Sequence, residues 1–132
     1  MTHRLLQIDD DPVILFLHNK LFSKYTNSKI EQFKNGKLAL DHILENNGPD
    51  ISYMLLLDIN MPVMNGWEFM DEISNLGLDK SISVVILTSS ADYADLDKSK
   101  SYDNIVHFIQ KPLTREKIEK IPLLLEYLNL QE

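Results

Sequence analysis

The chain has 132 residues, of which 44% are hydrophobic and 25% are charged, proportions that are ordinary for one soluble globular domain. Its 20 acidic and 13 basic residues give a formal net charge of −7, which disfavours non-specific binding to nucleic acid or to an anionic membrane. The chain has no cysteine, which excludes a disulfide scaffold, a thiolate metal site and a cysteine nucleophile.

Short apolar runs recur along the chain and predict β-strands. The runs are too short for ordinary helices, and most are rich in β-branched or aromatic residues. In chain order they are Leu5–Ile8, the weaker Ile30–Phe33, Tyr53–Leu57, Ile82–Leu87 and Ile105–Ile109. The longest uninterrupted apolar stretches have about five residues, whereas a membrane-spanning helix needs about 20. Because the amino-terminal segment also lacks the apolar core of a signal peptide, we expect a cytoplasmic protein.

Longer amphipathic segments follow the predicted strands and indicate helices, because their apolar residues recur at near-helical spacing. These residues are Val13, Phe16, Leu17 and Leu21 in the first segment, Leu38, Leu40, Ile43 and Leu44 in the second, Trp67, Met70, Ile73 and Leu76 in the third, and Ile118, Ile121, Leu125 and Leu128 in the last. Residues 92–103 are rich in Asp, Lys and Ser, so we expect a fourth helix there that is short or mobile. Pro122 predicts a kink or break in the last segment near Ile121.

Helix-starting and helix-ending residues mark the boundaries of these segments. Asp11, directly before a proline, is typical of an N-cap at a helix start. The pair Asn65 and Gly66 predicts a turn before the third helix, and Gly77 predicts the end of that helix. Five strand–helix units predict a doubly wound α/β fold, a parallel sheet with helices on both faces. We expect one domain over residues 1–132, with no room for an output domain.

Polar side chains follow four of the predicted strands. They are Asp9–Asp11 after the first, Asp58 after the third, Thr88–Ser90 after the fourth and Lys111 after the fifth. In a doubly wound sheet these positions meet at one edge, where ligands bind. Two carboxylates about 4 Å apart repel by roughly 4 kcal/mol at an effective dielectric constant near 20, and one ammonium does not balance three of them. The cluster therefore predicts a Mg²⁺ site, at which a carboxylate beside a lysine and a hydroxyl can attack phosphorus.

The segments Ile8–Pro12, Leu57–Gly66, Leu87–Ser89 and Gln110–Pro112 resemble the receiver domain of two-component response regulators. The overall resemblance is to stand-alone receivers of the chemotaxis type, and it extends from about Arg4 to the last helix. It implies a flavodoxin-like fold with five parallel strands in the order 2-1-3-4-5. It also implies a stand-alone switch that accepts a phosphoryl group from a sensor histidine kinase or a histidine phosphotransfer protein, with Mg²⁺ as cofactor.

The resemblance assigns the phosphoacceptor and the metal ligands. Asp58 is the expected phosphoacceptor and also a metal ligand. Asp10 is expected to bind the metal directly, and Asp9 is expected to help through water. Asn60 is expected to offer its backbone carbonyl to the metal. Asp11 is expected to cap its helix instead.

The resemblance also assigns the residues that respond to phosphorylation. Thr88 is the expected switch hydroxyl, and Lys111 is expected to pair with the phosphoryl group. Ser89 is expected to supply a backbone contact, and Ser90 occupies a position that the family links to phosphoryl lifetime. Phe108 stands at the aromatic switch position, where the family often has Tyr. The face built from the fourth helix, the fifth strand and the fifth helix is expected to bind a downstream protein target.

Two other functions stay open on the residues alone. One is an interaction module with a receiver fold that works without phosphorylation. The other is an aspartyl-phosphate phosphatase of the haloacid dehalogenase type, which Asn60 disfavours because it cannot act as the general acid. We expect a monomer or weak homodimer that binds neither nucleic acid nor membrane and that is not an enzyme beyond its own phosphorylation and dephosphorylation. The four histidines have no metal-ligand spacing and are expected to have structural or surface roles.

Overall fold

The computed structural model describes residues 1–89 and 92–131, and its elements alternate between strand and helix along most of this part of the chain. The strands are β1 (Thr2–Ile8), β2 (Glu31–Phe33), β3 (Ile51–Asp58), β4 (Ile82–Thr88) and β5 (Ile105–Gln110). The helices are α1 (Pro12–Phe22), α2 (Gly36–Asn46), α3 (Gly66–Asn75), α4 (Tyr93–Ser99), α5 (Arg115–Glu119) and α6 (Pro122–Asn129), with a 3₁₀ turn at Asp79–Ser81.

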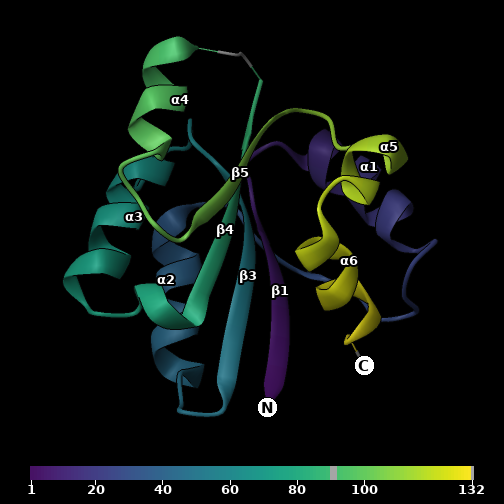
Figure 1. Ribbon diagram of the computed structural model, residues 1–132, viewed down its shortest axis with the longest axis horizontal. Helices are drawn as coiled ribbons and strands as arrows, with labels where there is room; N and C mark the ends of the chain where they lie inside the picture. The colour runs from purple at the N-terminus through teal and green to yellow at the C-terminus, as the bar shows by residue number, and fades with distance from the viewer. Residues whose placement is uncertain (90–91, 132) are drawn as a thin grey trace.

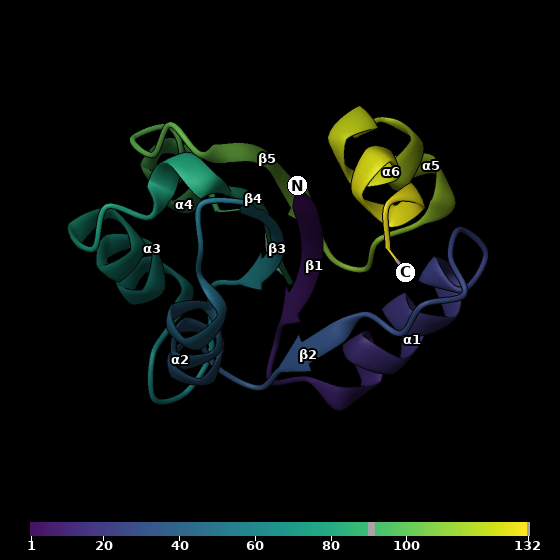
Figure 2. The same cartoon turned by 90° about the horizontal axis from the view of Figure 1, so that it is seen from below.

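The strands form one parallel sheet in the order β2-β1-β3-β4-β5, which confirms the predicted fold class and strand order. Strands β1 and β3 are longer than their apolar runs predict. They pair from Thr2 opposite Ile51 up to Ile8 opposite Leu57, so backbone pairing extends both strands into their more polar beginnings. Figure 1 shows β1, β3 and β4 side by side, and Figure 2 shows α2, α3 and α4 on one side of the sheet and α1, α5 and α6 on the other.

Each face of the sheet carries its own apolar core. On the α2–α3 side, Leu55 and Leu57 of β3 pack with Phe69 of α3. On the α1–α6 side, Leu56 of β3 packs with Leu124 of α6. Because both faces are covered, the central strand is apolar at successive positions, as the continuous run in the sequence predicted.

The predicted apolar face of the first helix is wrong. The side chains of Val13, Phe16 and Leu17 are exposed, and the buried residues of α1 are Leu15, His18 and Phe22. These three residues have the spacing of one helix face. Because the middle one is a histidine, a search for apolar residues at helical spacing does not find this face. Five further residues of the predicted helix faces are only partly buried or exposed, namely Leu21, Leu38, Leu44, Leu76 and Leu125.

The predicted helix boundaries are confirmed. The Asp11 side chain accepts a hydrogen bond from the backbone N–H of Val13, 2.9 Å away, and caps α1. Gly77, with φ of 70°, follows the end of α3. The last helical segment divides into α5 and α6, and Pro122 opens α6, where its missing N–H is not needed. The fourth helix is short, as predicted, with seven residues.

Within residues 1–89 and 92–131, every helix is too short or too polar to cross a bilayer.

Candidate functional site

The carboxyl ends of four strands bring the predicted site residues to one edge of the sheet. Asp9 follows β1, Asp58 ends β3, Thr88 ends β4 and Lys111 follows β5. Carboxylate oxygens of Asp9, Asp10 and Asp58 all lie within 4.8 Å of one another. The acidic cluster expected from the sequence is therefore present in the fold.

Lys111 connects two of these carboxylates. Its Nζ lies 2.9 Å from Oδ2 of Asp9, to which it donates a hydrogen bond, and 3.4 Å from Oδ2 of Asp58. The three side chains are only 5–8% exposed, whereas Asp10 is exposed at the margin of the cluster. The ammonium is thus held between two buried carboxylates, and the third carboxylate faces solvent.

The charges of the cluster are not balanced. Burial, followed by repulsion from Asp9, raises the pKa of Asp58 to about 6, although Lys111 and the N–H of Asn60 oppose this shift. Burial alone would lower the pKa of Lys111, but its hydrogen bond to Asp9 and the negative charges of Asp9 and Asp58 raise it overall. Three carboxylates beside one ammonium leave an excess of negative charge that a cation would neutralise.

The donor set fits a magnesium ion. Carboxylate oxygens are hard ligands, and Mg²⁺ usually takes one or two protein carboxylates while it keeps several waters. Asp10 provides an exposed carboxylate, and the buried oxygens of Asp9 and Asp58 lie beside it. The family resemblance also implies that the backbone carbonyl of Asn60 is a metal ligand, and Asn60 is exposed two residues beyond Asp58, at the same edge.

Backbone hydrogen bonds hold the cluster in place. The N–H of Asp11 donates to Oδ1 of Asp9 over 2.9 Å, so the start of α1 orients that carboxylate. The N–H of Lys111 donates to the carbonyl of Thr88 over 2.7 Å, which ties the end of β5 to the end of β4. The peptide bond between Lys111 and Pro112 is cis.

The loop after Asp58 packs tightly against α3. The N–H of Gly66 donates to the carbonyl of Ile59 over 2.8 Å, and a Cβ at Gly66 would lie 2.6 Å from the backbone oxygen of Asp58. Only glycine lets α3 begin this close to the end of β3 without a backbone shift. In the same loop Val63 has φ of 69° and an exposed side chain.

The expected switch residues lie on β4 and β5. Thr88 is buried and pairs with Gln110 of β5. The residue before it, Leu87, pairs with Asp58 of β3. Ser89 is exposed, and Ser90 lies outside the described residues. Phe108 is partly buried, and a cavity of about 320 Å³ lies between it, Gln110 and α4.

On the α1 side of the sheet, two buried polar residues form hydrogen bonds whose partners the sequence did not predict. Gln7 of β1 donates from Nε2 to Oδ1 of Asn19 over 2.8 Å, and its Oε1 has no hydrogen-bond partner among the described residues. His18 accepts a hydrogen bond at Nε2 from the N–H of Leu113, 3.0 Å away. A histidine within the apolar pattern of α1 could have indicated a buried hydrogen bond at His18, but the pattern does not identify its partner.

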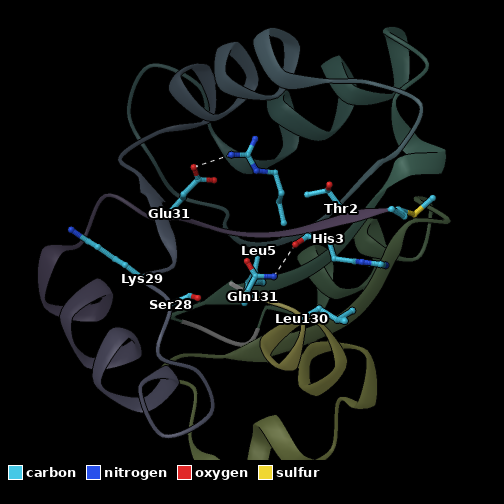
Figure 3. Close-up of a pocket in the computed structure, with 10 residues that line it drawn as sticks. Thr2, His3, Leu5, Ser28, Lys29, Glu31, Leu130 and Gln131 are labelled. Carbon is cyan, nitrogen blue, oxygen red and sulfur yellow. Dashed lines mark hydrogen bonds and ion pairs between the residues drawn. The ribbon is translucent and has the colours of Figure 1, made fainter.

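A separate cavity lies at the opposite end of the strands. It measures about 370 Å³ and is lined by the first residues of β1 and by the end of α6, as Figure 3 shows. Arg4 and Glu31 form an ion pair of 3.4 Å beside it, and Gln131 donates to the carbonyl of His3. The acidic cluster and Lys111 are at the other edge of the sheet, so the chemistry predicted from the sequence belongs there.

Comparisons with known proteins agree with this geometry. The family model of the response regulator receiver domain matches residues 5–121. Sporulation initiation phosphotransferase F of Bacillus subtilis is 31% identical over 118 residues, which are 89% of this chain and 89% of that protein.

Solved structures show the same fold. The crystal structure of a two-component response regulator from Legionella pneumophila is 32% identical, with a TM-score of 0.77 over 95% of this chain and 98% of that one. A two-component response regulator from Cytophaga hutchinsonii is 26% identical, with a TM-score of 0.79 over 95% of this chain and 97% of that one.

Proposed function

This chain belongs to the family of response regulator receiver domains, and on that premise we propose that it is a phosphorylation switch whose phosphoacceptor is Asp58. The observation that carries the proposal is the position of Lys111, whose Nζ lies within 3.4 Å of both Asp9 and Asp58. This arrangement places an ammonium beside the carboxylate that would receive the phosphoryl group, where it can stabilise the charge of the transferred oxygens.

The phosphodonor is a phosphohistidine of a sensor histidine kinase or of a histidine phosphotransfer protein. A carboxylate oxygen of Asp58 forms a bond to phosphorus while the bond between phosphorus and the donor's imidazole nitrogen breaks, and the electron pair returns to that nitrogen. With a pKa raised to about 6, Asp58 is mainly ionised at neutral pH and is more basic than an ordinary carboxylate. Asn60 has no acidic proton, so turnover of a separate phosphate ester is not part of the proposal.

Four groups would hold Mg²⁺: the carboxylates of Asp9, Asp10 and Asp58 and the backbone carbonyl of Asn60. When bound, the ion would neutralise phosphoryl oxygens and help to orient them for transfer. Lys111 forms an ion pair with the buried carboxylate of Asp9, and Asp10 lies at the solvent-exposed margin of the site.

The switch consists of Thr88, Ser89 and Phe108. The hydroxyl of Thr88 and the backbone of Ser89 would bind the phosphoryl group, and Phe108 would turn inward as the Thr88 loop moves. The cavity of about 320 Å³ beside Phe108 supports this step, since it offers space between the ring and α4. The movement would remodel a protein-binding face on α4, β5 and α5.

The phosphodonor docks on α1. Val13, Phe16 and Leu17 form an exposed apolar patch on this helix, which begins directly after the acidic cluster. Phe16 is 58% exposed, with Nζ of Lys20 4.8 Å from its ring centre. An apolar patch next to a reactive carboxylate suits a protein donor better than a small one. Phe16→Asp should therefore slow transfer from the donor protein and leave phosphorylation by acetyl phosphate unchanged.

The test of the proposed function uses acetyl phosphate and Mg²⁺. Mass spectrometry should show one added phosphoryl group on wild type and on Asp50→Asn, a control at an exposed aspartate outside the cluster. Asp58→Asn should gain none. If wild type stays unmodified by both acetyl phosphate and phosphorylated donors, or if Asp58→Asn is modified equally, the proposal is wrong.

A further inference from the structure

His18 makes an unusual contact for a residue in the middle of a buried helix face. Its side chain lies between Leu15 and Phe22 on the buried stripe of α1, and the residue is only 2% exposed. Its Nε2 accepts a hydrogen bond from the N–H of Leu113 over 3.0 Å. An imidazole nitrogen can accept only when it carries no proton, so the ring is neutral with its proton on Nδ1. Burial, followed by the positive charge of Lys111, lowers the pKa of His18 to about 4, which agrees with a neutral ring.

The partner of His18 lies two residues beyond Lys111. Pro112 stands between them and has no N–H, so the backbone donors of this segment are those of Lys111 and Leu113. The first donates to the carbonyl of Thr88 and the second to His18. The segment that carries the lysine is therefore anchored on both sides, once to the sheet and once to α1.

These two anchors differ in what they connect. The bond to Thr88 joins neighbouring strands, whereas the bond to His18 joins residues that are 95 positions apart in the sequence. Both Figures 1 and 2 show α1 next to the segment that contains α5, on the same side of the sheet. At its beginning, the same helix orients Asp9 through the N–H of Asp11. Helix α1 and its N-cap are thus hydrogen-bonded to Asp9, one partner of the ion pair, and to Leu113, two residues beyond Lys111, the other partner.

We propose that His18 is a positioning residue that holds the backbone after Lys111 so that the ammonium stays between Asp9 and Asp58. The proposal rests on the proposed function, because it gives Lys111 its role in phosphoryl transfer. The N–H of Leu113 is buried, and an apolar side chain at position 18 would leave it without an acceptor. The segment would then shift toward another acceptor and carry Lys111 away from the carboxylates.

The kinetic test compares variants at position 18 with and without Lys111. His18→Leu fills similar space but has no acceptor, whereas the side-chain oxygen of His18→Gln can take the place of Nε2. His18→Leu should slow phosphorylation by acetyl phosphate about tenfold or more, as expected for a misplaced catalytic group, and His18→Gln should restore most of the rate. In a Lys111→Met background, His18→Leu should cause no further decrease. Equal slowing with and without Lys111, or no rescue by a folded His18→Gln, would overturn the proposal.

A second measurement does not depend on phosphorylation. In nitrogen-15 NMR spectra, the Nε2 of His18 should be unprotonated, and His18→Leu should shift both the Leu113 amide and the Lys111 ammonium signals. If wild type fails to be phosphorylated while these shifts occur, the proposed function fails and the coupling between His18 and Lys111 stands. If the Lys111 signal is unchanged in His18→Leu, the positioning role is wrong whatever the phosphorylation result. Should His18→Leu not fold, His18→Phe, whose side chain also has no acceptor, replaces it in both measurements with the same expected outcomes.

Discussion

The acidic rim (Asp9, Asp10, Asp58 and Lys111) and the surface around α4 are held in place by different means. The rim is anchored by the ends of β1, β3 and β5 and by backbone hydrogen bonds from Asp9 to β2 and from Lys111 to β4, and most of its charges are buried. Helix α4 is seven residues long, and its first residue, Tyr93, is 85% exposed. The sheet therefore fixes the residues of the acidic rim, while α4 depends on a few side-chain contacts.

Those contacts are made with side chains of α3. Nε1 of Trp67 donates to Asp95 of α4 over 3.1 Å, and Nζ of Lys98 lies 5.2 Å from the centre of the Trp67 ring system. Tyr102, just beyond α4, stacks on Trp67 with a centroid distance of 5.8 Å and donates from its hydroxyl to Asp71 over 2.6 Å. An element held in this way can move without disturbing the sheet, which suits a surface that changes between two states.

The largest effect is expected when the rim loses its cation. Lys111→Met leaves two buried carboxylates without their ammonium, so the free energy of unfolding in urea without Mg²⁺ should fall by about 3 kcal/mol. Adding Mg²⁺ should recover part of the loss, because a divalent cation replaces the missing charge. Lys80→Met, at an exposed position, is the control and should change stability by less than about 0.5 kcal/mol. An equal loss of unfolding free energy in both variants would show that Lys111 does not stabilise the buried carboxylates of the rim.

Asp58→Asn should stabilise the protein at pH 7. The pKa of Asp58 is about 6 in the folded chain and 3.8 in the absence of structure, so folding takes up a proton between these values and stability falls as the pH rises through this window. The variant carries no charge here and should exceed wild type by about 1–3 kcal/mol at pH 7 without Mg²⁺. The difference should disappear below the ordinary carboxylate pKa. Thermal unfolding at several pH values measures this, and a difference independent of pH would contradict it.

A smaller and more local effect is expected at α4. Trp67→Phe removes the hydrogen bond to Asp95 and part of the stacking on Tyr102, at a cost of about 1–2 kcal/mol. Hydrogen exchange should accelerate at the amides of α4 far more than at those of β3. Asp95→Ala removes the same bond without changing the core and should loosen α4 in the same way. Uniform acceleration across the chain would show that α4 is not held separately.

The smallest expected effect is at Val63. A β-branched residue with φ of 69° is strained, and Val63 is too exposed to compensate by packing. Val63→Gly should therefore raise the free energy of unfolding by about 1 kcal/mol, even after the entropic cost of a glycine. Urea titration measures the gain, and Val63→Ala, which keeps the strain, should not reproduce it.

The rim could be predicted from the sequence because each of its residues lies one or two positions after an apolar run that forms a strand. The carboxyl ends of parallel strands meet at one edge, so order along the chain is enough to bring Asp9, Asp58 and Lys111 together. The contacts of His18 and Trp67 could not be predicted in this way. They join helices to segments 95 and 28 positions away, and they depend on how each helix is rotated about its axis. That rotation follows from packing, which the apolar pattern of α1 did not reveal.

Gly66 has a consequence for genetic screens of this protein. It has no side chain, and any side chain there would collide with the backbone at the end of β3. A selection for loss of signalling should therefore recover substitutions at Gly66 alongside those at Asp58. Such alleles would keep every reactive group in the sequence, so an inspection of the acidic residues alone would classify them as functional.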